Sequence, residues 1–290
     1  MVGFTPLMNS LRTARLLLGS CLAVSLPLTA LAKDAAPAPA ALVSFTEAES
    51  IQRLERSKSK VDFFHLANQF ESQSNKAFCG PTSATIVLNA LRAGNAQIEK
   101  PQDRTLLSDA DFQVISTVFS PTFDPLFRRY TQNTFLSYEP AQKVKTREQV
   151  FGKPAAPDQK SDSGLQLRQM HAMLQAHGLE AQLRIVDDKL PDATITAELK
   201  QNLKTPGDYV IINYHRPTLG QKGGGHISPL GAYDEASKSF LVMDVNPNGE
   251  AWVWVKAADL IRSMRTLDVV ENRGYVLVKE GMATTAKKAE

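Results

Sequence analysis

Cys79 stands at a position where thiol chemistry is favoured. Together with Gly80 it directly precedes Pro81–Leu91, which is apolar on most faces and carries proline in its first turn, a pattern that predicts a buried helix. A cysteine at the N-terminus of a helix is stabilised as a thiolate by unpaired N–H groups and the helix dipole. These residues alone leave three roles open for Cys79: a disulfide in a dimer, an inert buried side chain, or a reactive thiol.

A histidine and an aspartate are predicted to meet in the second half of the chain. His226–Tyr233 and Phe240–Val245 have the composition of two strands joined as a hairpin. Residues that face each other across a hairpin have a constant sum of positions, which brings His226 within a residue or two of direct opposition to Asp244. The carboxylate would then accept a hydrogen bond from the imidazole and favour the charged ring. The alternative is a structural pair on the sheet surface.

A thiolate, a histidine and an acid that orients the histidine form the Cys-His-Asp version of nucleophilic acyl transfer. No comparable argument places a carboxylate beside the other histidines, which are His65, His171, His177 and His215. The sequence shows no cluster with metal-ligand spacing and no serine-nucleophile motif. Gly223–Gly225 precedes a strand and not a helix, so it does not match a phosphate-binding loop.

The N-terminal segment has the pattern of a secretory signal peptide over residues 1–32. Two arginines precede the apolar run Leu16–Leu31, which ends in the small-x-small motif Ala30-Leu31-Ala32. The run is shorter than the roughly 20 apolar residues that a membrane span needs. A lipidation site at Cys21 would leave too short an apolar stretch ahead of it. We therefore expect export to the periplasm, with Cys79 as the lone cysteine of the mature protein.

The composition is that of a globular protein, with 43% hydrophobic and 22% charged residues and a net charge of +3. It excludes a disordered chain, a collagen-like repeat and a disulfide scaffold, and it gives no reason to expect a nucleic-acid partner. A Pro/Ala-rich linker is predicted over 33–41, one domain over 42–281 and a polar tail over 282–290. Within the domain, Val144–Ser163 is predicted to be a long surface loop.

Hydrophobic periodicity predicts helices in the first half and strands in the second, which together indicate an α+β domain. Besides the segment after Cys79, the predicted helices are Ala48–Arg56, Ser108–Thr117, Leu165–Ala176 and Ile195–Leu203. Besides the hairpin, the predicted strands are Tyr209–Tyr214, Trp252–Val255 and Gly274–Val278.

Three blocks of sequence, taken in order, resemble a known family. The first runs from Asp62-Phe63-Phe64 through Gln73 and Ala77-Phe78-Cys79-Gly80 to Val87–Leu91; the second covers 210–245 and includes Gly224-Gly225-His226 and Met243-Asp244-Val245; the third is Arg273-Gly274-Tyr275. They resemble phytochelatin synthase, in the short bacterial form that corresponds to the catalytic domain. The resemblance implies a papain-like cysteine-peptidase fold, with the nucleophile at a helix N-terminus and an antiparallel sheet in the C-terminal half.

The resemblance also implies roles for five residues. Cys79 would be the nucleophile, His226 the general base and acid, and Asp244 the residue that orients the histidine. Gln73 matches the family's oxyanion-hole glutamine, and Arg273 matches an arginine that holds a substrate carboxylate.

The reaction implied by the resemblance starts from glutathione. The enzyme releases glycine, and a γ-glutamylcysteinyl thioester passes to water or to a second glutathione. No built-in cofactor or metal site is expected, because cadmium or zinc would arrive as glutathione thiolates. The expected partner is glutathione or a related small thiol peptide, in a homodimer with no nucleic-acid or membrane partner. The alternatives are a papain-like peptidase acting on another small peptide and a non-catalytic thiol- or metal-binding protein.

Two segments depart from the family pattern. Asn246–Glu250 replaces the family's basic and aromatic run after the aspartate, so an acceptor site cannot be carried over. The region between Asn95 and Ser163 is longer than in short members, which leaves the rim of the cleft to be found from the structure.

Overall fold

The computed structural model describes residues 41–120 and 122–281. The predicted signal peptide over 1–32, nearly all of the linker over 33–41, and the tail over 282–290 lie outside these residues, so they stay predictions. Within the described ranges, no helix has both the length and the apolar character needed to cross a bilayer.

In the described part of the chain, seven strands form one antiparallel sheet in the order β1-β6-β5-β4-β3-β7-β2. The strands are β1 (Val43–Ser44), β2 (Leu179–Ile185), β3 (Asp208–His215), β4 (Gly225–Asp234), β5 (Ser239–Val242), β6 (Val253–Lys256) and β7 (Gly274–Glu280). All five predicted strand segments are confirmed, but the one expected to reach Val245 ends at Val242. Val242 is the last residue of β5 to pair with β4.

The helices confirm the α+β prediction. They are α1 (Ala48–Arg56), α2 (Val61–Asn68), α3 (Cys79–Arg92), α4 (Asp109–Val118), α5 (Gln132–Ser137), α6 (Glu139–Gln142), α7 (Arg147–Val150), α8 (Leu167–Ala176), α9 (Asp192–Asn202) and α10 (Ala257–Met264), with 3-10 turns η1 (Arg104–Leu106) and η2 (Arg216–Leu219). Every predicted helix is present, and α1 has the predicted bounds. The sequence patterns missed the helices α2, α5, α6, α7 and α10, together with the strands β1 and β2.

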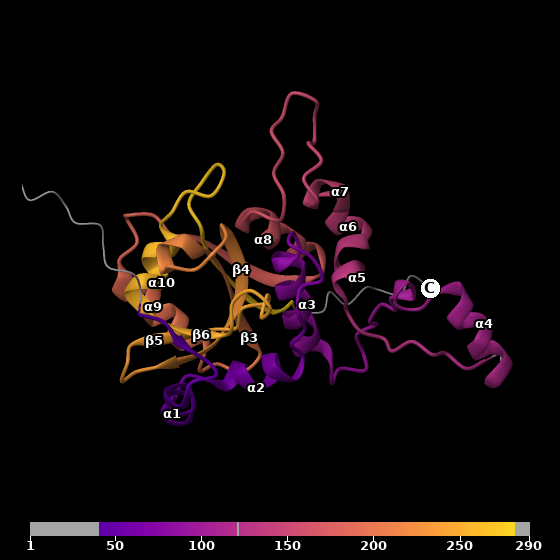
Figure 1. Cartoon of the computed structure of the whole chain (residues 1–290), viewed down its shortest axis with the longest axis horizontal. Coiled ribbons are helices and arrows are strands. Elements are labelled where there is room, and N and C mark those ends of the chain that lie inside the picture. Colours follow the sequence, from indigo (N-terminus) through magenta and orange to yellow (C-terminus); the bar gives the residue numbers. More distant parts are fainter. Residues whose placement is uncertain (1–40, 121, 282–290) are drawn as a thin grey trace, which may run out of the picture. The chain divides into compact units, whose positions relative to one another are not determined.

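The sheet is covered by helices on both faces, and β3 shows how. Its side chains alternate: Val210 and Ile212 pack with α9 and α10, while Ile211 packs with α3 and α8. A strand buried on both faces is apolar almost throughout, as this one is in sequence. Figure 1 shows α9 and α10 on one side of β3 and β4 and α3 on the other.

Helix α3 is buried over nearly its whole length, from Gly80 to Asn89. A polar contact fastens it to the sheet: Ser83 Oγ lies 2.8 Å from the carbonyl oxygen of Cys79 and 3.1 Å from that of Ile227 on β4. The first turn of α3 is therefore held beside the strand that carries His226.

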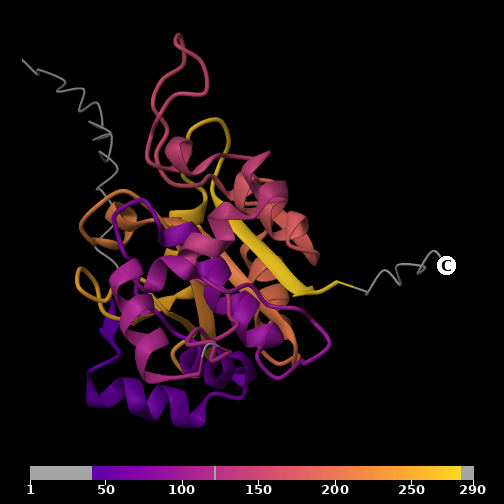
Figure 2. The ribbon, with the colours of Figure 1, turned by 90° about the vertical axis from the view of Figure 1, so that its right-hand side faces the viewer.

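The predicted surface loop over Val144–Ser163 is wrong in its first part. Residues 147–150 form α7, and Val150 is fully buried because it packs into the core with α8. The segment that follows does project from the domain, as Figures 1 and 2 show between α7 and α8. Its return is anchored by the buried Lys145, whose Nζ lies 2.9 Å from Asp162 Oδ2.

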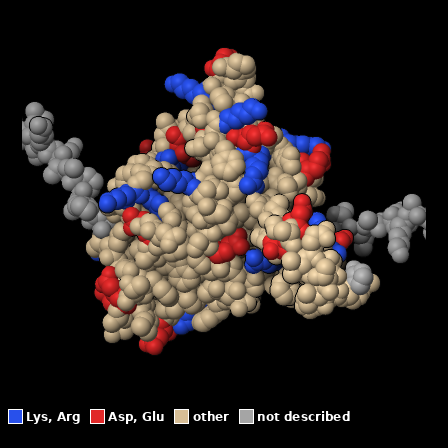
Figure 3. Space-filling model, turned by 45° about the vertical axis from the view of Figure 1, so that its right-hand side comes forward, with Lys and Arg blue, Asp and Glu red and all other residues tan. Residues whose placement is uncertain are grey.

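Charged side chains of both signs are interspersed on the face that Figure 3 shows. Many form ion pairs across elements, such as Arg168 with Glu271 at 2.7 Å. Exposed pairs of this kind contribute about 0–1 kcal/mol each, so the core and not the surface holds the fold together.

A bulge between β4 and β5 sets the position of Asp244. The register shifts between Leu230 and Ala232, and a Cβ atom on the intervening Gly231 would lie only 2.7 Å from Met243 Sδ. Glycine at this position leaves the space that the side chain of Met243 fills.

We predict that Gly231→Ala destabilises the protein by about 1–3 kcal/mol, because the added methyl overpacks against Met243. The measurement is the free energy of unfolding in urea. Gly94→Ala is the matched control, since a Cβ there meets nothing within 4 Å. Equal stability of the two variants would show that the close approach at Gly231 has no cost.

Candidate active site

The thiol of Cys79 is placed at the first residue of α3. The residue is partly buried, and the backbone N–H groups of Gly80 and Ile227 interact with its sulfur. Phe78 precedes the helix without a side-chain cap, so the backbone N–H of Gly80 serves the thiol and that of Cys79 is left for a bound ligand. The predicted position at a helix N-terminus is confirmed.

His226 and Asp244 meet as the hairpin arithmetic predicts. The Nε2–H of His226 donates to Asp244 Oδ1 at 2.9 Å, with both side chains almost completely buried. Because Nε2 is engaged with the carboxylate, Nδ1 is the ring nitrogen left for the thiol of Cys79, with which the imidazole interacts. The structure therefore brings Cys79, His226 and Asp244 together in that order.

Two further side chains that the sequence analysis missed complete the environment of Asp244. Tyr214 Oη donates to Asp244 Oδ2 at 3.0 Å, and Arg216 Nη2 donates to the same oxygen at 2.5 Å. The backbone N–H of Asn246 adds a bond of 2.7 Å to Oδ1. The hairpin rule could have found Tyr214, because Tyr214 pairs with His226 across β3 and β4. No pattern in the sequence indicated Arg216.

Electrostatics favours a thiolate-imidazolium pair. Burial by itself raises the pKa of the Cys79 thiol, but the hydrogen bond and charge of His226 outweigh it and hold that pKa below the ordinary value. Burial by itself lowers the pKa of His226, but Asp244 and Cys79 raise it to about 9. The pKa of Asp244 stays far below its usual range despite burial, because His226 and Arg216 stabilise the carboxylate.

A cleft of about 230 Å³ opens beside Cys79 and His226. Strands β3 and β4 form one wall, the segment before α3 forms a second, and the base of the projecting loop forms a third. The lining residues other than Cys79 and His226 are Lys76, Ala77, Asp162, Ser163, Gly164, Leu165, Gln166, Asn213, Gly225, Ile227 and Asp268. Asp162 and Ser163 in this wall belong to the end of the extended region, whose role the sequence left open.

Gln73 lies near the site, with its side chain engaged locally. Its backbone N–H donates to the carbonyl oxygen of Val245 at 2.8 Å, which places the residue beside Asp244. Its amide Nε2 donates to the carbonyl oxygen of Asn75 at 2.6 Å. An amide nitrogen carries two protons, so one donor remains after this bond. The oxyanion-hole role stays a prediction.

Arg273 is buried behind the cleft and is not among the residues that line it in the described ranges. Its Nη2 donates to Asp268 Oδ1 at 2.7 Å, and its Nη1 donates to the carbonyl oxygen of Leu267 at 2.6 Å. Gly225 lies so close to the guanidinium that a Cβ atom would be 2.9 Å from Nη2. In this arrangement Arg273 fixes Asp268, which does line the cleft; direct contact with a substrate carboxylate stays a prediction.

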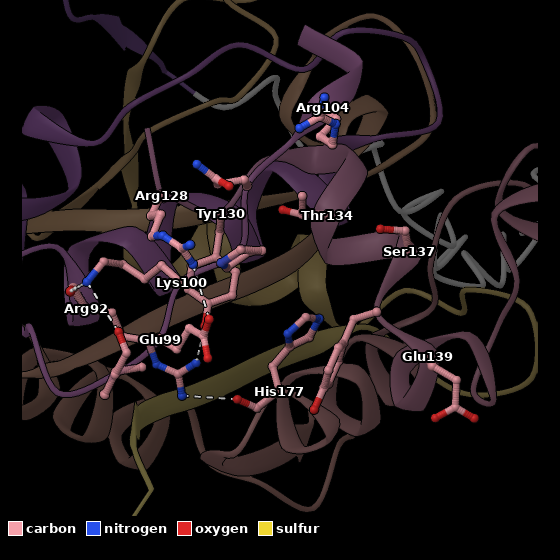
Figure 4. A pocket seen from close by; sticks show the side chains of 14 residues that line it. Arg92, Glu99, Lys100, Arg104, Arg128, Tyr130, Thr134, Ser137, Glu139 and His177 are labelled. Carbon is pink, nitrogen blue, oxygen red and sulfur yellow. Dashed lines mark hydrogen bonds and ion pairs between the residues drawn. The ribbon is translucent and has the colours of Figure 1, made fainter. Parts of the chain in front are cut away.

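A larger cavity, of about 760 Å³, lies at the other end of α3 (Figure 4). Arg92 lines it from the last residue of the helix, about 20 Å along the axis from Cys79 at 1.5 Å per residue. Several of its cations are already engaged by protein groups: Arg92 with Glu280 at 2.6 Å, Arg128 with Glu99 at 3.2 Å, and Lys100 with the carbonyl oxygen of Asn95 at 2.8 Å. This cavity is separate from the cysteine cleft.

Over residues 41–120 and 122–281, His, Cys, Asp and Glu side chains do not gather in groups of three that could hold a metal ion. The expectation that metal arrives only with the substrate is not tested by this finding.

We predict that His226→Gln slows alkylation of Cys79 by iodoacetamide at neutral pH by about tenfold or more, because only the N–H groups of Gly80 and Ile227 then oppose the rise in thiol pKa that burial causes. The measurement is the alkylation rate as a function of pH. His171→Gln is the matched control, since His171 Nε2 contacts the carbonyl oxygen of Ala181 and does not line the cleft. A wild-type rate in the His226 variant would contradict the ion pair.

Three comparisons relate this chain to known proteins. The family model described as phytochelatin synthase matches residues 34–110 and 123–275. "Glutathione gamma-glutamylcysteinyltransferase 1" of Triticum aestivum is 27% identical over 74% of this chain, and "Glutathione gamma-glutamylcysteinyltransferase" of Schizosaccharomyces pombe is 23% identical over 75% of it. The matched parts cover 35% and 43% of those relatives, so this chain corresponds to less than half of their length.

A solved structure, the peptidase domain of the Streptococcus ABC transporter ComA, matches 73% of this chain and 98% of its own. The identity is 11% and the TM-score is 0.36, which is too low to support an argument. The family model, by contrast, matches well over half of the residues. This chain therefore belongs to the phytochelatin synthase family.

Proposed function

We propose that this protein cleaves the Cys-Gly bond of glutathione through an acyl-enzyme intermediate on Cys79. The observation that carries the proposal is the buried arrangement of Cys79, His226 and Asp244, in which the 2.9 Å bond from His226 to Asp244 fixes the imidazole. The names of the wheat and fission-yeast relatives, which describe γ-glutamylcysteinyl transfer from glutathione, support this choice of substrate.

In the first half of the reaction, the Cys79 thiolate attacks the carbonyl carbon of the Cys-Gly peptide bond. The negative charge that develops on the carbonyl oxygen would be stabilised by the backbone N–H of Cys79, with Gln73 as the expected side-chain donor. The His226 imidazolium then gives its proton to the glycine nitrogen as the C–N bond breaks. Glycine leaves as a neutral amine, and a γ-glutamylcysteinyl thioester remains on Cys79.

In the second half, neutral His226 acts as a base. It takes a proton from water or from the amine of a second glutathione as that nucleophile attacks the thioester carbonyl. The products are γ-glutamylcysteine or a chain longer by one γ-glutamylcysteinyl unit, and the Cys79 thiolate and His226 imidazolium are restored. Asp244 keeps the imidazole in one tautomer and orientation throughout both halves.

The size and the lining of the cleft favour a small substrate that carries charges of both signs. Its volume of about 230 Å³ is below the roughly 300–1,000 Å³ of typical ligand sites, which favours a short peptide over a protein segment. Carboxylates of Asp162 and Asp268 and the amine of Lys76 line it.

Cadmium or zinc would enter the cleft as glutathione thiolates. Export to the periplasm and assembly into a homodimer are also part of the proposal.

The test is to incubate the protein with glutathione, with and without cadmium, and to measure free glycine. We expect glycine together with γ-glutamylcysteine or a longer product, and a loss of at least about a thousandfold in rate for Cys79→Ser. Mass spectrometry after brief exposure should show the acyl adduct on Cys79. The proposal is lost if glycine release is absent or is unchanged in the serine variant. Cleavage of other short peptides in preference to glutathione would support a peptidase instead.

Lys76 supplies a further prediction about substrate binding. It is exposed, lies three residues before Cys79, and is, apart from His226, the one basic side chain among the residues lining the cleft in the described ranges. We expect Lys76→Gln to raise KM for glutathione by about fivefold, in line with loss of one exposed charge pair, and to leave KM for glutathione amide unchanged. Lys58→Gln, at an exposed position outside the cleft, is the matched control. An equal change of KM for glutathione and for glutathione amide would refute an ion pair between Lys76 and a carboxylate of glutathione.

A further inference from the structure

Arg216 contacts the carboxylate of the proposed active site, yet it takes part in none of the proposed bond-making or proton-transfer steps. It begins η2, immediately after β3, and is only 7% exposed. Its Nη2 donates to Asp244 Oδ2 at 2.5 Å. A buried arginine on a catalytic carboxylate has both a charge and a geometry to contribute, because guanidinium stays protonated throughout the accessible pH range.

The two oxygens of Asp244 are divided between two sets of donors. Oδ1 accepts from His226 Nε2 at 2.9 Å and from the N–H of Asn246 at 2.7 Å, whereas Oδ2 accepts from Arg216 and from Tyr214 at 3.0 Å. A carboxylate whose second oxygen is already bound to a cation attracts an imidazolium less strongly than a free carboxylate does. The guanidinium charge itself also disfavours a second positive charge nearby.

The glycine-rich segment between η2 and β4 encloses this arginine. The backbone N–H of Arg216 donates to the carbonyl oxygen of Gly224 at 3.1 Å, and the N–H of Gln221 donates to that of Arg216 at 3.1 Å. Gly223 has φ +107, a conformation that favours glycine, and a Cβ atom added there would lie 3.7 Å from Arg216 Cδ. The loop therefore keeps water from the guanidinium, so that its charge acts through a medium of low polarity.

We propose that Arg216 is a positioning residue that holds Asp244 and, by sharing its carboxylate with His226, sets the pH at which the Cys79-His226 ion pair is lost. The proposal rests on the proposed function only in taking Cys79 and His226 as the reacting pair. It gives Gly223 and Gly224 a role in enclosing Arg216, while Gly225 lies against Arg273.

The other groups that face His226 do not substitute for Arg216. Cys79 from α3 is the other half of the ion pair, and Tyr214 from β3 is neutral and stands edge-on to the imidazole with ring centroids 5.7 Å apart. Asp268 and Arg273, on the far side of Gly225, are paired with each other at 2.7 Å, so their opposite charges largely offset one another.

The test uses alkylation of Cys79 by iodoacetamide as a function of pH, which reads the ion pair without any substrate. Arg216→Gln removes the charge and keeps a hydrogen-bond donor, while Arg216→Lys keeps the charge. We expect the alkaline limb of the profile, which reports loss of the imidazolium proton, to move upward by about one pH unit in the glutamine variant. In the lysine variant it should stay near its wild-type position.

A uniform loss of rate with both limbs unmoved in Arg216→Gln would overturn the proposal, since that result is what a merely structural arginine gives. Circular dichroism checks that the variant is folded. If it is not, Tyr214→Phe decides, because removing a neutral donor from Oδ2 should move the same limb in the same direction by a smaller amount, and an unmoved limb would refute the sharing. Failure of the wild-type protein to cleave glutathione would leave this readout intact, so the two proposals fail separately.

Discussion

A fully buried carboxylate has to be satisfied from within the protein, and Asp244 imposes that requirement on much of the domain. Its exposed fraction is zero, so leaving either oxygen without partners would cost several kcal/mol. Four donors meet it, from β4, from β3, from η2 and from the turn that follows Asp244 itself. Strands β3 and β4 must therefore keep their register, and η2 must fold back over the end of the sheet.

The second requirement is that the thiol reach the imidazole from a different layer of the fold. Cys79 belongs to a helix and His226 to the sheet, so their separation depends on how α3 packs against β4. Ser83 bridges the two layers through carbonyl oxygens of Cys79 and Ile227, and Gly80 lets Leu165 approach within 2.9 Å of where a Cβ would lie. The same packing positions the Cys79 thiol and closes one wall of the cleft.

The long region between Asn95 and Ser163 serves this site at its C-terminal end. Lys145, buried and 2.9 Å from Asp162, holds the return of the projecting loop against the cleft. The rest of the region builds α4 to α7 and lines the separate cavity at the far end of α3, where Arg92 and Arg128 are neutralised by glutamates. The extension thus shapes the rim of the cleft without supplying a member of the Cys-His-Asp group.

Local periodicity and hairpin geometry were enough to predict part of this site from the residues alone. They placed Cys79 at a helix start and Asp244 within reach of His226, because a helix is defined by neighbours along the chain and a hairpin by one turn. Three contacts could be found only in the folded protein: Arg216 shares Asp244, Asp162 lines the cleft, and Arg273 is held by Asp268. Those contacts join separate elements, and which of them meet depends on how the helices and sheet pack, a property that no single segment encodes.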